Sequence, residues 1–161
     1  MSNILTLGEC SRLVEEVAEI DHGVVVYCHG TYDYMHYGHI SQFKEAAKLG
    51  DILVVGITAD EYINRGPGKP VFNHEVRAGS VEALECVDYV TIFEEDTAAE
   101  LIELLKPDLQ VKGGTTPVVV EREIVEAYGG KVVTLEKIEG PSTTAIINRI
   151  LEANQERRSS Q

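Results

Sequence analysis

Short apolar runs alternate along the chain with longer stretches in which apolar residues recur at helical spacing. The run from Val24 to Cys28 is apolar at every position and lies between Gly23 and Gly30. Continuous apolar runs of this length are typical of strands that are buried on both faces of a sheet. Similar runs predict further strands at residues 52–57, 88–93, 109–111 and 131–135.

The stretches between these runs predict helices, because their apolar residues repeat with the period of a helix. The predicted helices cover residues 4–20, 38–49, 74–85, 97–105, 120–128 and 142–151. Strands that alternate with helices through short connections are typical of a parallel sheet covered on both faces. We therefore expect an α/β fold with a Rossmann-like parallel sheet of about five strands and helices on both faces.

The expected fold is a single domain at residues 1–152, with an N-terminal helix within residues 1–20. The 161 residues are 43% hydrophobic, which is enough for one sizeable core. Residues 153–161 are mostly polar and are expected to form a flexible tail.

The composition favours a cytoplasmic protein. No apolar run approaches the ~20 residues that a membrane-spanning helix needs. The first residues include acids where a signal peptide would carry bases. The three cysteines, Cys10, Cys28 and Cys86, are an odd number without paired spacing, which indicates reduced thiols.

The formal net charge of −13 limits the choice of partners. Nucleic acids and anionic membranes bind basic surfaces, so neither is an expected partner. Small anionic substrates remain compatible with the charge. They require a site that is locally positive, built from helix N-termini and a few bases.

The loop after the first strand contains the strongest candidate chemistry. Ligands of open parallel sheets bind beyond the carboxyl ends of the strands, and Gly30 to His39 follow such an end. His36 and His39 are three positions apart, so both imidazoles lie on one face if a helix begins there. Gly38 leaves room for a bulky group, and unpaired N–H groups at a helix start attract anions. These features predict a cradle for a polyphosphate, whose charge would favour imidazolium over imidazole.

Other interpretations of this loop stay open at this point. Two histidines three positions apart can face solvent, or they can bind a metal together with His22 or His29. No cysteine or carboxylate follows at metal-ligand spacing, so the metal site is the weaker alternative. Thr31 and Asp33 can cap the turn without contacting a ligand.

Several segments resemble the cytidylyltransferase-like nucleotidylyltransferase superfamily. Gly30-Thr31-Tyr32-Asp33 with His36-Tyr37-Gly38-His39 is similar to its GTFD and HxGH signature, and Arg77 matches an arginine that opens the helix after strand two. Val111-Lys112-Gly113-Gly114 and Glu139 to Thr144 resemble the VKGG and EG-x-STT segments of its heptose-phosphate branch. The resemblance covers about residues 5–150. It is closest to the adenylyltransferase domain of bacterial ADP-heptose synthase, and glycerol-3-phosphate cytidylyltransferase is more distant.

The resemblance implies a nucleotidylyltransferase of carbohydrate biosynthesis. It would transfer a nucleoside monophosphate from a nucleoside triphosphate, with ATP favoured, to a sugar phosphate such as a heptose 1-phosphate, and release pyrophosphate. The attacking phosphate oxygen is already anionic, so catalysis depends on positioning and charge neutralisation. Mg²⁺ would be held mainly by the substrate phosphates and not by a metal site of the chain. A homodimer is implied as well, because relatives are commonly dimers.

The matching positions receive their roles from the resemblance. The catalytic residues would be His36, His39 and Lys112. The nucleotide would be bound by Gly30, Thr31, Tyr32, Gly38, Arg77, Gly113, Ser142, Thr143 and Thr144. The candidates for contacts with the second substrate are Asp33, Asp60 and Lys69, and Arg65 lies in the same Gly-Pro loop as Lys69.

Some of these residues have a structural alternative. Ser142, Thr143 and Thr144 can cap the last helix as well as hold phosphates. Lys112 can be a solvated surface charge. Arg77 can form a surface ion pair with an acidic neighbour, Glu75 or Glu82.

Two departures from the family pattern leave the base and the acceptor open. Glu85 takes the place of an arginine found in the glycerol-phosphate branch, and Thr115-Thr116 replaces the Asp-Tyr of the heptose branch. The alternative is a CTP-dependent cytidylyltransferase that acts on a polyol phosphate or phosphonate. An alternative from another class is a non-catalytic nucleotide-binding module, against which the intact histidine pair and the segment Ser142–Thr144 both argue.

Overall fold

A computed structural model of the chain describes residues 2–159 except 19–22, 67, 115–119 and 137–141. Its centre is a six-stranded sheet in which every pair of neighbouring strands is parallel. The strands are β1 (Ile4–Leu5), β2 (Val25–Gly30), β3 (Ile52–Thr58), β4 (Tyr89–Phe93), β5 (Leu109–Lys112) and β6 (Lys131–Thr134). The predicted α/β, Rossmann-like parallel fold is confirmed.

The strands lie in the order β1-β4-β3-β2-β5-β6. From β2 the chain moves outward through β3 and β4, and it then returns to build β5 and β6 on the other side of β2. The direction of winding therefore reverses between β2 and β5. Such a reversal separates the loops at the carboxyl ends of the two strands and opens a crevice between them.

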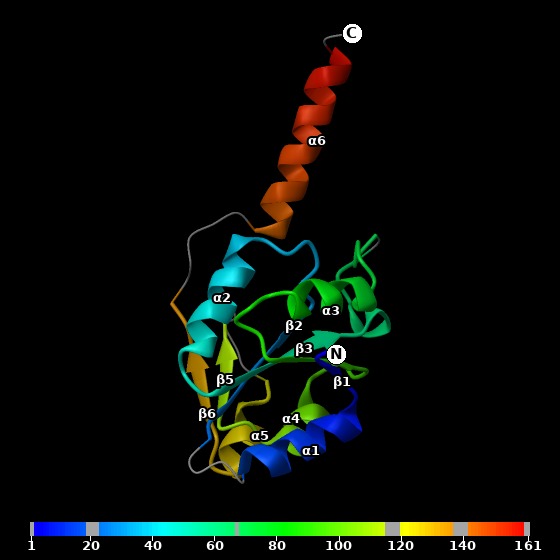
Figure 1. Ribbon diagram of the computed structural model, residues 1–161. Coiled ribbons are helices and arrows are strands. Elements are labelled where there is room, and N and C mark those ends of the chain that lie inside the picture. The colour runs from blue at the N-terminus through cyan, green and yellow to red at the C-terminus, as the bar shows by residue number, and fades with distance from the viewer. Residues whose placement is uncertain (1, 19–22, 67, 115–119, 137–141, 160–161) are drawn as a thin grey trace.

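Helices cover both faces of the sheet (Figure 1). One face carries α1 (Leu7–Ala18), α4 (Ala99–Leu105) and α5 (Arg122–Ala127). The other carries α2 (Tyr37–Ala47) and α3 (His74–Glu82), while a short 3-10 helix, η1 (Asp60–Tyr62), follows β3.

The alternation of side chains along β2 divides the core into two halves. Val26 and Cys28 pack with Phe43 of α2, and Val25 and Tyr27 pack on the opposite face against α1 and α4. All four residues are almost completely buried. This explains why β2 is apolar at every position, and it makes β2 a rigid support for the loop that follows it.

Two chain ends differ from the sequence prediction. The predicted helix over 4–20 begins at Leu7, because Ile4 and Leu5 pair with Val90 and Thr91 as the sixth strand. The last helix, α6 (Thr143–Ser159), continues through residues that were expected to be a flexible tail. Glu, Gln and Arg are good helix formers, and Arg157 and Arg158 in the last turn interact favourably with the helix dipole.

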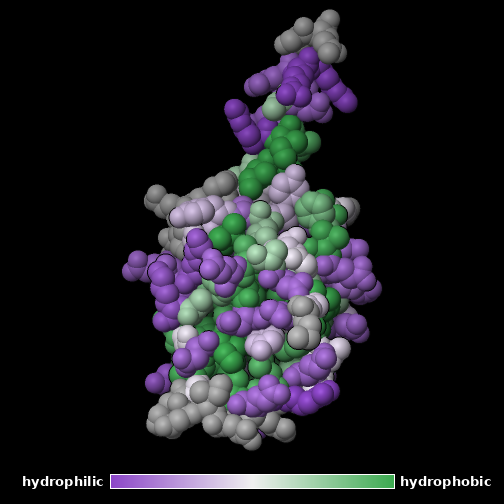
Figure 2. Space-filling model, viewed as in Figure 1, coloured by the Kyte–Doolittle hydropathy of each residue, from purple (hydrophilic) through white to green (hydrophobic). Residues whose placement is uncertain are grey.

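Helix α6 extends away from the rest of the molecule (Figure 1), and none of its described residues is buried. Apolar residues occupy its lower half, which is green in the space-filling view, and charged residues occupy its far end (Figure 2). Ile150 and Leu151 are 51% and 54% exposed. Among the helices that the structure describes, none is long and apolar enough to cross a membrane.

Candidate active site

A cleft of about 850 Å³ opens where the sheet reverses its winding, at the carboxyl ends of β2 and β5. Most of the predicted site residues line it. They are Gly30, Thr31, Tyr32, Asp33, His36, Gly38, His39, Lys69, Lys112, Gly113, Ser142, Thr143 and Thr144. Residues separated by more than a hundred positions in the sequence therefore meet in one place. The cations Arg65, Lys69 and Lys112 give this cleft the local positive charge that an acidic chain needs for binding phosphates.

His36 and His39 start α2 with a reciprocal pair of hydrogen bonds. His36 is the N-cap residue, and its Nδ1 accepts a hydrogen bond from the backbone N–H of Gly38 at 3.1 Å. The Nδ1 of His39 accepts one from the backbone N–H of His36 at 3.4 Å. The two rings stack with their centroids 3.9 Å apart. The arrangement satisfies two helix-start donors, as a capping box does with serine and glutamate.

These hydrogen bonds determine where each imidazole carries its proton. A ring nitrogen that accepts from a backbone N–H has no proton of its own, so the proton lies on Nε2. Nε2 is on the side of the ring away from the backbone, and both rings line the cleft. Each histidine can therefore present a neutral N–H donor to a ligand.

Burial reinforces the neutral state of both rings. It lowers the pKa of His39 to about 4, with smaller contributions from His36 and Arg65, and it also lowers the pKa of His36. The expectation that phosphate would favour imidazolium concerns the liganded chain. In the chain alone, imidazolium would put a second N–H against each backbone donor, so the cap favours imidazole.

Glycines allow close contact at two points of the cleft. A Cβ on Gly38 would lie 3.0 Å from Cε1 of His36, and a Cβ on Gly113 would lie 2.9 Å from Oε1 of Gln42. A side chain at residue 38 would therefore push the His36 ring out of its stack. The sequence analysis expected Gly38 to leave room for a bulky group, and the group that the structure places beside it is the ring of His36.

Lys112 ends β5 in a buried polar cluster at the cleft. Its Nζ donates to Nε2 of His29 at 2.5 Å and lies 3.6 Å from Oε2 of Glu121, the residue before α5. The side chains of all three residues are 6–11% exposed. Lys112 is thus not the solvated surface charge that the sequence left as an alternative. Burial lowers the pKa of Lys112, while the contacts with His29 and Lys112 hold the pKa of Glu121 well below its usual range.

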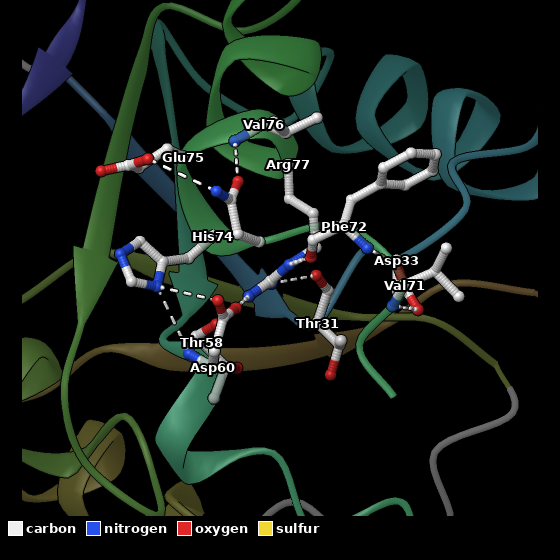
Figure 3. Close-up of polar contacts among 11 residues, drawn as sticks. Thr31, Asp33, Thr58, Asp60, Val71, Phe72, His74, Glu75, Val76 and Arg77 are labelled. Carbon is white, nitrogen blue, oxygen red and sulfur yellow. Dashed lines mark hydrogen bonds and ion pairs between the residues drawn. The ribbon is translucent and has the colours of Figure 1, made fainter. Parts of the chain in front are cut away.

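Arg77 is not among the residues that line the cleft. Its side chain reaches instead toward Thr31, Thr58 and Asp60 (Figure 3). It is 1% exposed, and its guanidinium donates to the carbonyl oxygens of Thr31, Thr58 and Phe72 at 2.5, 2.7 and 2.9 Å. Asp60 accepts a further hydrogen bond from Arg77 at 2.5 Å. Arg77 therefore does not form the surface ion pair with Glu75 or Glu82 that the sequence left as an alternative. It also has no direct role in the cleft. Arg77 fixes the backbone of the loop after β2 at Thr31.

Asp33 and Asp60 are engaged with the protein. The Asp33 carboxylate accepts hydrogen bonds from the N–H groups of Val71 at 2.9 Å and Phe72 at 3.1 Å. These hydrogen bonds join the loop after β2 to the segment before α3. Asp33 also lines the cleft. Asp60 pairs with Arg77 and with His74, outside the cleft lining. Lys69 is the third candidate for contacts with the second substrate, and it also lines the cleft. Unlike Asp33 and Asp60, it has no hydrogen bond or ion pair with another side chain among the described residues.

The start of α6 shows the capping role expected for it and also lies at the cleft, where phosphate binding stays a prediction. Ser142 Oγ accepts a hydrogen bond from the N–H of Ala145 at 3.2 Å, which is a capping contact. Thr143 Oγ1 donates to the carbonyl oxygen of Asp33 at 3.3 Å. Both residues and Thr144 line the same cleft as the histidine pair. The remaining matched residues of this segment, 139–141, lie outside the described residues, as do Thr115 and Thr116.

The side chains along the cleft offer few ligands for a metal ion. Within the described ranges no group of three or more His, Cys, Asp or Glu residues could hold a metal. The carboxylates along the described lining are Asp33, which is already engaged, and Glu136. Mg²⁺ commonly takes one or two carboxylates together with water and substrate phosphates, so the donor set fits a phosphate-held ion.

Sequence reasoning missed two residues of this site. Glu121 follows an apolar stretch and begins a helix, and no local signal in the sequence links it to Lys112. His29 was considered only as a metal ligand, but it lies beside Lys112 across the join of β2 and β5. Contacts of this kind depend on the strand order, which the sequence does not show.

The chain matches the family model described as cytidylyltransferase-like over residues 27–160. It belongs to the cytidylyltransferase-like family. The match includes all of the cleft residues described above, and it confirms the predicted enzyme class, a nucleotidyltransferase.

Curated relatives carry the name bifunctional protein HldE. The chain is 43% identical to that of Syntrophotalea carbinolica over 92% of its own length and 31% of the relative's. It is 46% identical to that of Pelobacter propionicus over 80% of its length and 27% of the relative's. The chain thus spans less than a third of the length of these relatives. Their identities of 43% and 46% confirm the resemblance to the heptose-synthase branch.

Solved structures share the fold. A lipopolysaccharide core biosynthesis protein from Thermoplasma volcanium aligns with a TM-score of 0.62 at 27% identity, over 73% of this chain and 98% of that one. A pantothenate synthetase from Thermus thermophilus aligns with a TM-score of 0.59 at 16% identity, over 85% of this chain and 62% of that one. The second likeness concerns the fold alone.

Proposed function

We propose that the chain transfers adenosine monophosphate from ATP to a sugar phosphate, such as a heptose 1-phosphate, and releases pyrophosphate. The observation that carries the proposal is the meeting of the histidine pair, Lys112 and Ser142–Thr144 in one cleft. The preference for ATP and a heptose phosphate is supported by the resemblance to ADP-heptose synthase and by 43–46% identity with the HldE proteins.

In the proposed reaction an oxygen of the sugar phosphate attacks the α-phosphorus of the nucleotide. The bond between that phosphorus and the bridging oxygen breaks, and pyrophosphate leaves with the bonding electrons. The nucleophile is already an anion, so no side chain has to remove a proton. The protein supplies alignment of the two phosphates and stabilises the charge that develops on their oxygens.

The Nε2–H groups of His36 and His39 are suited to that stabilisation. They are neutral donors held by the helix cap, so they need no reorganisation during the reaction. Arg65, Lys69 and Lys112 add positive charge around the leaving group, and the N-termini of α2 and α6 add backbone donors. Mg²⁺, when bound between the phosphates, would neutralise further charge on them.

Pyrophosphate release tests the proposed function. The protein is incubated with Mg²⁺, each of ATP and CTP, and a panel of sugar 1-phosphates and polyol phosphates. We expect release with ATP and a sugar 1-phosphate. Release with CTP and a polyol phosphate would establish the alternative cytidylyltransferase instead. Nucleotide binding without release for every acceptor would indicate a non-catalytic module.

The proposal extends to a homodimer that covers α6. This 17-residue helix has no buried residue among those described, and isolated helices of that length are marginal in water. A second copy offers the same apolar stripe around Ile150 and Leu151 for a two-fold contact.

Light scattering checks the dimer. We expect twice the chain's mass of 17.7 kDa for the wild type. The double substitution Ile150→Glu with Leu151→Glu should give monomer. Arg149→Glu changes the net charge equally on another side of the helix and should leave the dimer intact. A monomeric wild type would rule the dimer out.

A further inference from the structure

Lys112 occupies an unfavourable place for a cation. Its side chain is 11% exposed at the end of β5, which has a neighbouring strand on each side. Removing an ammonium group from water favours its neutral form, and burial accordingly lowers the pKa of Lys112. A neutral lysine could not neutralise a phosphate. Something in the protein must therefore offset the cost of burying its charge.

The groups that face Lys112 come from three elements. Cys28 and His29 lie on β2, Gln110 lies on β5, and Glu121 precedes α5. Burial raises the pKa of the Cys28 thiol to about 12 and lowers the pKa of His29, so both are neutral at physiological pH. Glu121 is the ionised group among them, and its charge raises the pKa of Lys112. Glu95 acts on His29 from further away.

We propose that Glu121 is a positioning residue, which keeps the ammonium group of Lys112 charged and aims it at the phosphates in the cleft. This inference rests on the proposed function, because the phosphates are those of the nucleotide. Glu121 does not touch the substrate in this arrangement: it is 5% exposed and does not line the cleft among the described residues.

The hydrogen bonds of the cluster leave one donor for a ligand. A lysine ammonium has three N–H groups. One donates to His29 at 2.5 Å, and a second faces Glu121 at 3.6 Å. Gln110 also donates to Glu121, at 3.4 Å, and so helps to hold the carboxylate in place. The third N–H of Lys112 is taken by neither of these contacts, and Lys112 lines the cleft.

Glu121→Gln tests the role, because it keeps the size of the side chain and removes its charge. Without the carboxylate, Lys112 should lose its proton at a lower pH. ATP affinity in the presence of Mg²⁺, measured by calorimetry, should then fall as the pH rises from about 7.5 to about 9.5, by up to about tenfold per pH unit. At the lower end of that range affinity should be at least as high as in wild type, because a negative charge near the phosphates is gone.

Arginine at residue 112 is the matched control. Its guanidinium stays charged throughout this pH range, with or without a neighbouring carboxylate. The double variant Glu121→Gln with Lys112→Arg should therefore bind ATP with a flat pH profile. A profile for Glu121→Gln alone that runs parallel to that of the wild type would overturn the proposal. A merely structural Glu121 would lower affinity equally at every pH.

A measurement on Lys112 itself separates this inference from the proposed function. The ¹³Cε resonance of Lys112, assigned by its absence in Lys112→Arg, reports the charge of the amine without any nucleotide. It should titrate at a lower pH in Glu121→Gln than in the wild type. If Glu121→Gln does not fold, Glu121→Asp keeps the charge at a greater distance and should lower the titration midpoint by a smaller amount. An unchanged midpoint would overturn the proposal even if the enzyme is active, and a shifted midpoint without nucleotide binding would contradict the proposed function alone.

Discussion

Each ring of the histidine pair uses its two nitrogens for different purposes. Nδ1 accepts a backbone hydrogen bond that starts α2, and Nε2 is left for the ligand. In the proposed reaction, stability and catalysis therefore depend on different atoms of one side chain. Amide side chains can separate the role of Nδ1 from the role of Nε2. The side-chain oxygen of asparagine can replace Nδ1 as an acceptor, and the amide nitrogen of glutamine can replace Nε2 as a donor.

We expect His39→Asn to lower kcat by about 100- to 1000-fold while changing the melting temperature little, because the cap acceptor is kept and the Nε2–H donor is lost. His39→Gln should behave in the opposite way, with a weaker cap and more residual activity. Steady-state kinetics and thermal unfolding of both variants check this. Equal activity of the two would show that Nε2 has no special role.

Gly38→Ala should displace the ring of His36, since the new Cβ would lie 3.0 Å from Cε1. We expect a loss of kcat of about tenfold or more, together with a loss of stability of about 1 kcal/mol from the disturbed cap. Gly79→Ala is the control, because nothing lies within 4 Å of a Cβ there. That variant should gain about 0.5–1 kcal/mol in the free energy of unfolding and keep full activity. Full activity of Gly38→Ala would contradict the role of the close approach.

At the scale of elements, apolar runs and helical spacing were enough to predict five of the strands and the helices. The sequence did not reveal β1, because a strand of two residues has too few positions to show a pattern. For Arg77 it suggested nucleotide binding, with a surface ion pair as the alternative, and not a buried anchor. Nothing local distinguishes an arginine at the start of an exposed helix from one that reaches under it to three backbone carbonyls. The cluster of Lys112 and Glu121 was invisible for the same reason, since it joins elements that are distant in sequence.

Arg77 connects four segments, so its removal should be costly. Arg77→Ala would leave the Asp60 carboxylate and the carbonyls of Thr31, Thr58 and Phe72 without their donor. We expect the free energy of unfolding to fall by about 3–5 kcal/mol, measured by chemical denaturation. Arg122→Ala removes an exposed ion pair with Glu126 and should cost less than about 0.5 kcal/mol. A similar small loss for Arg77 would contradict its anchoring role.

The start of α2 should also make stability depend on pH. His39 has a folded-state pKa of about 4, below its ordinary value of 6.5, so between these values the unfolded chain binds a proton that the folded chain does not. Stability is therefore lost as the pH falls through this window. We expect a decrease on the order of 1–2 kcal/mol between pH 7 and pH 4, part of which disappears in His39→Asn. Denaturation curves over this range check it, and an identical pH dependence in the variant would contradict the low pKa.

At the scale of the whole molecule, an acidic chain concentrates its useful positive charge in one cleft. The net charge is −13, yet Arg65, Lys69 and Lys112 all line the crevice between β2 and β5. The parallel sheet makes this possible because it brings the carboxyl ends of its strands, and the helix starts that follow them, to one edge. The motifs predicted most of the residues that line the cleft, although not the buried place of Arg77. The strand order explains why they meet.

Transfer of the α-phosphate tests the central claim most directly. The protein is incubated with Mg²⁺, a heptose 1-phosphate and ATP labelled in its α-phosphate, and the products are separated. The account predicts that the label appears in a nucleoside diphosphate sugar, with an equal amount of unlabelled pyrophosphate, and that His39→Asn nearly abolishes both. Label that stays in ATP with every sugar phosphate, or that is transferred from labelled CTP alone, would contradict it.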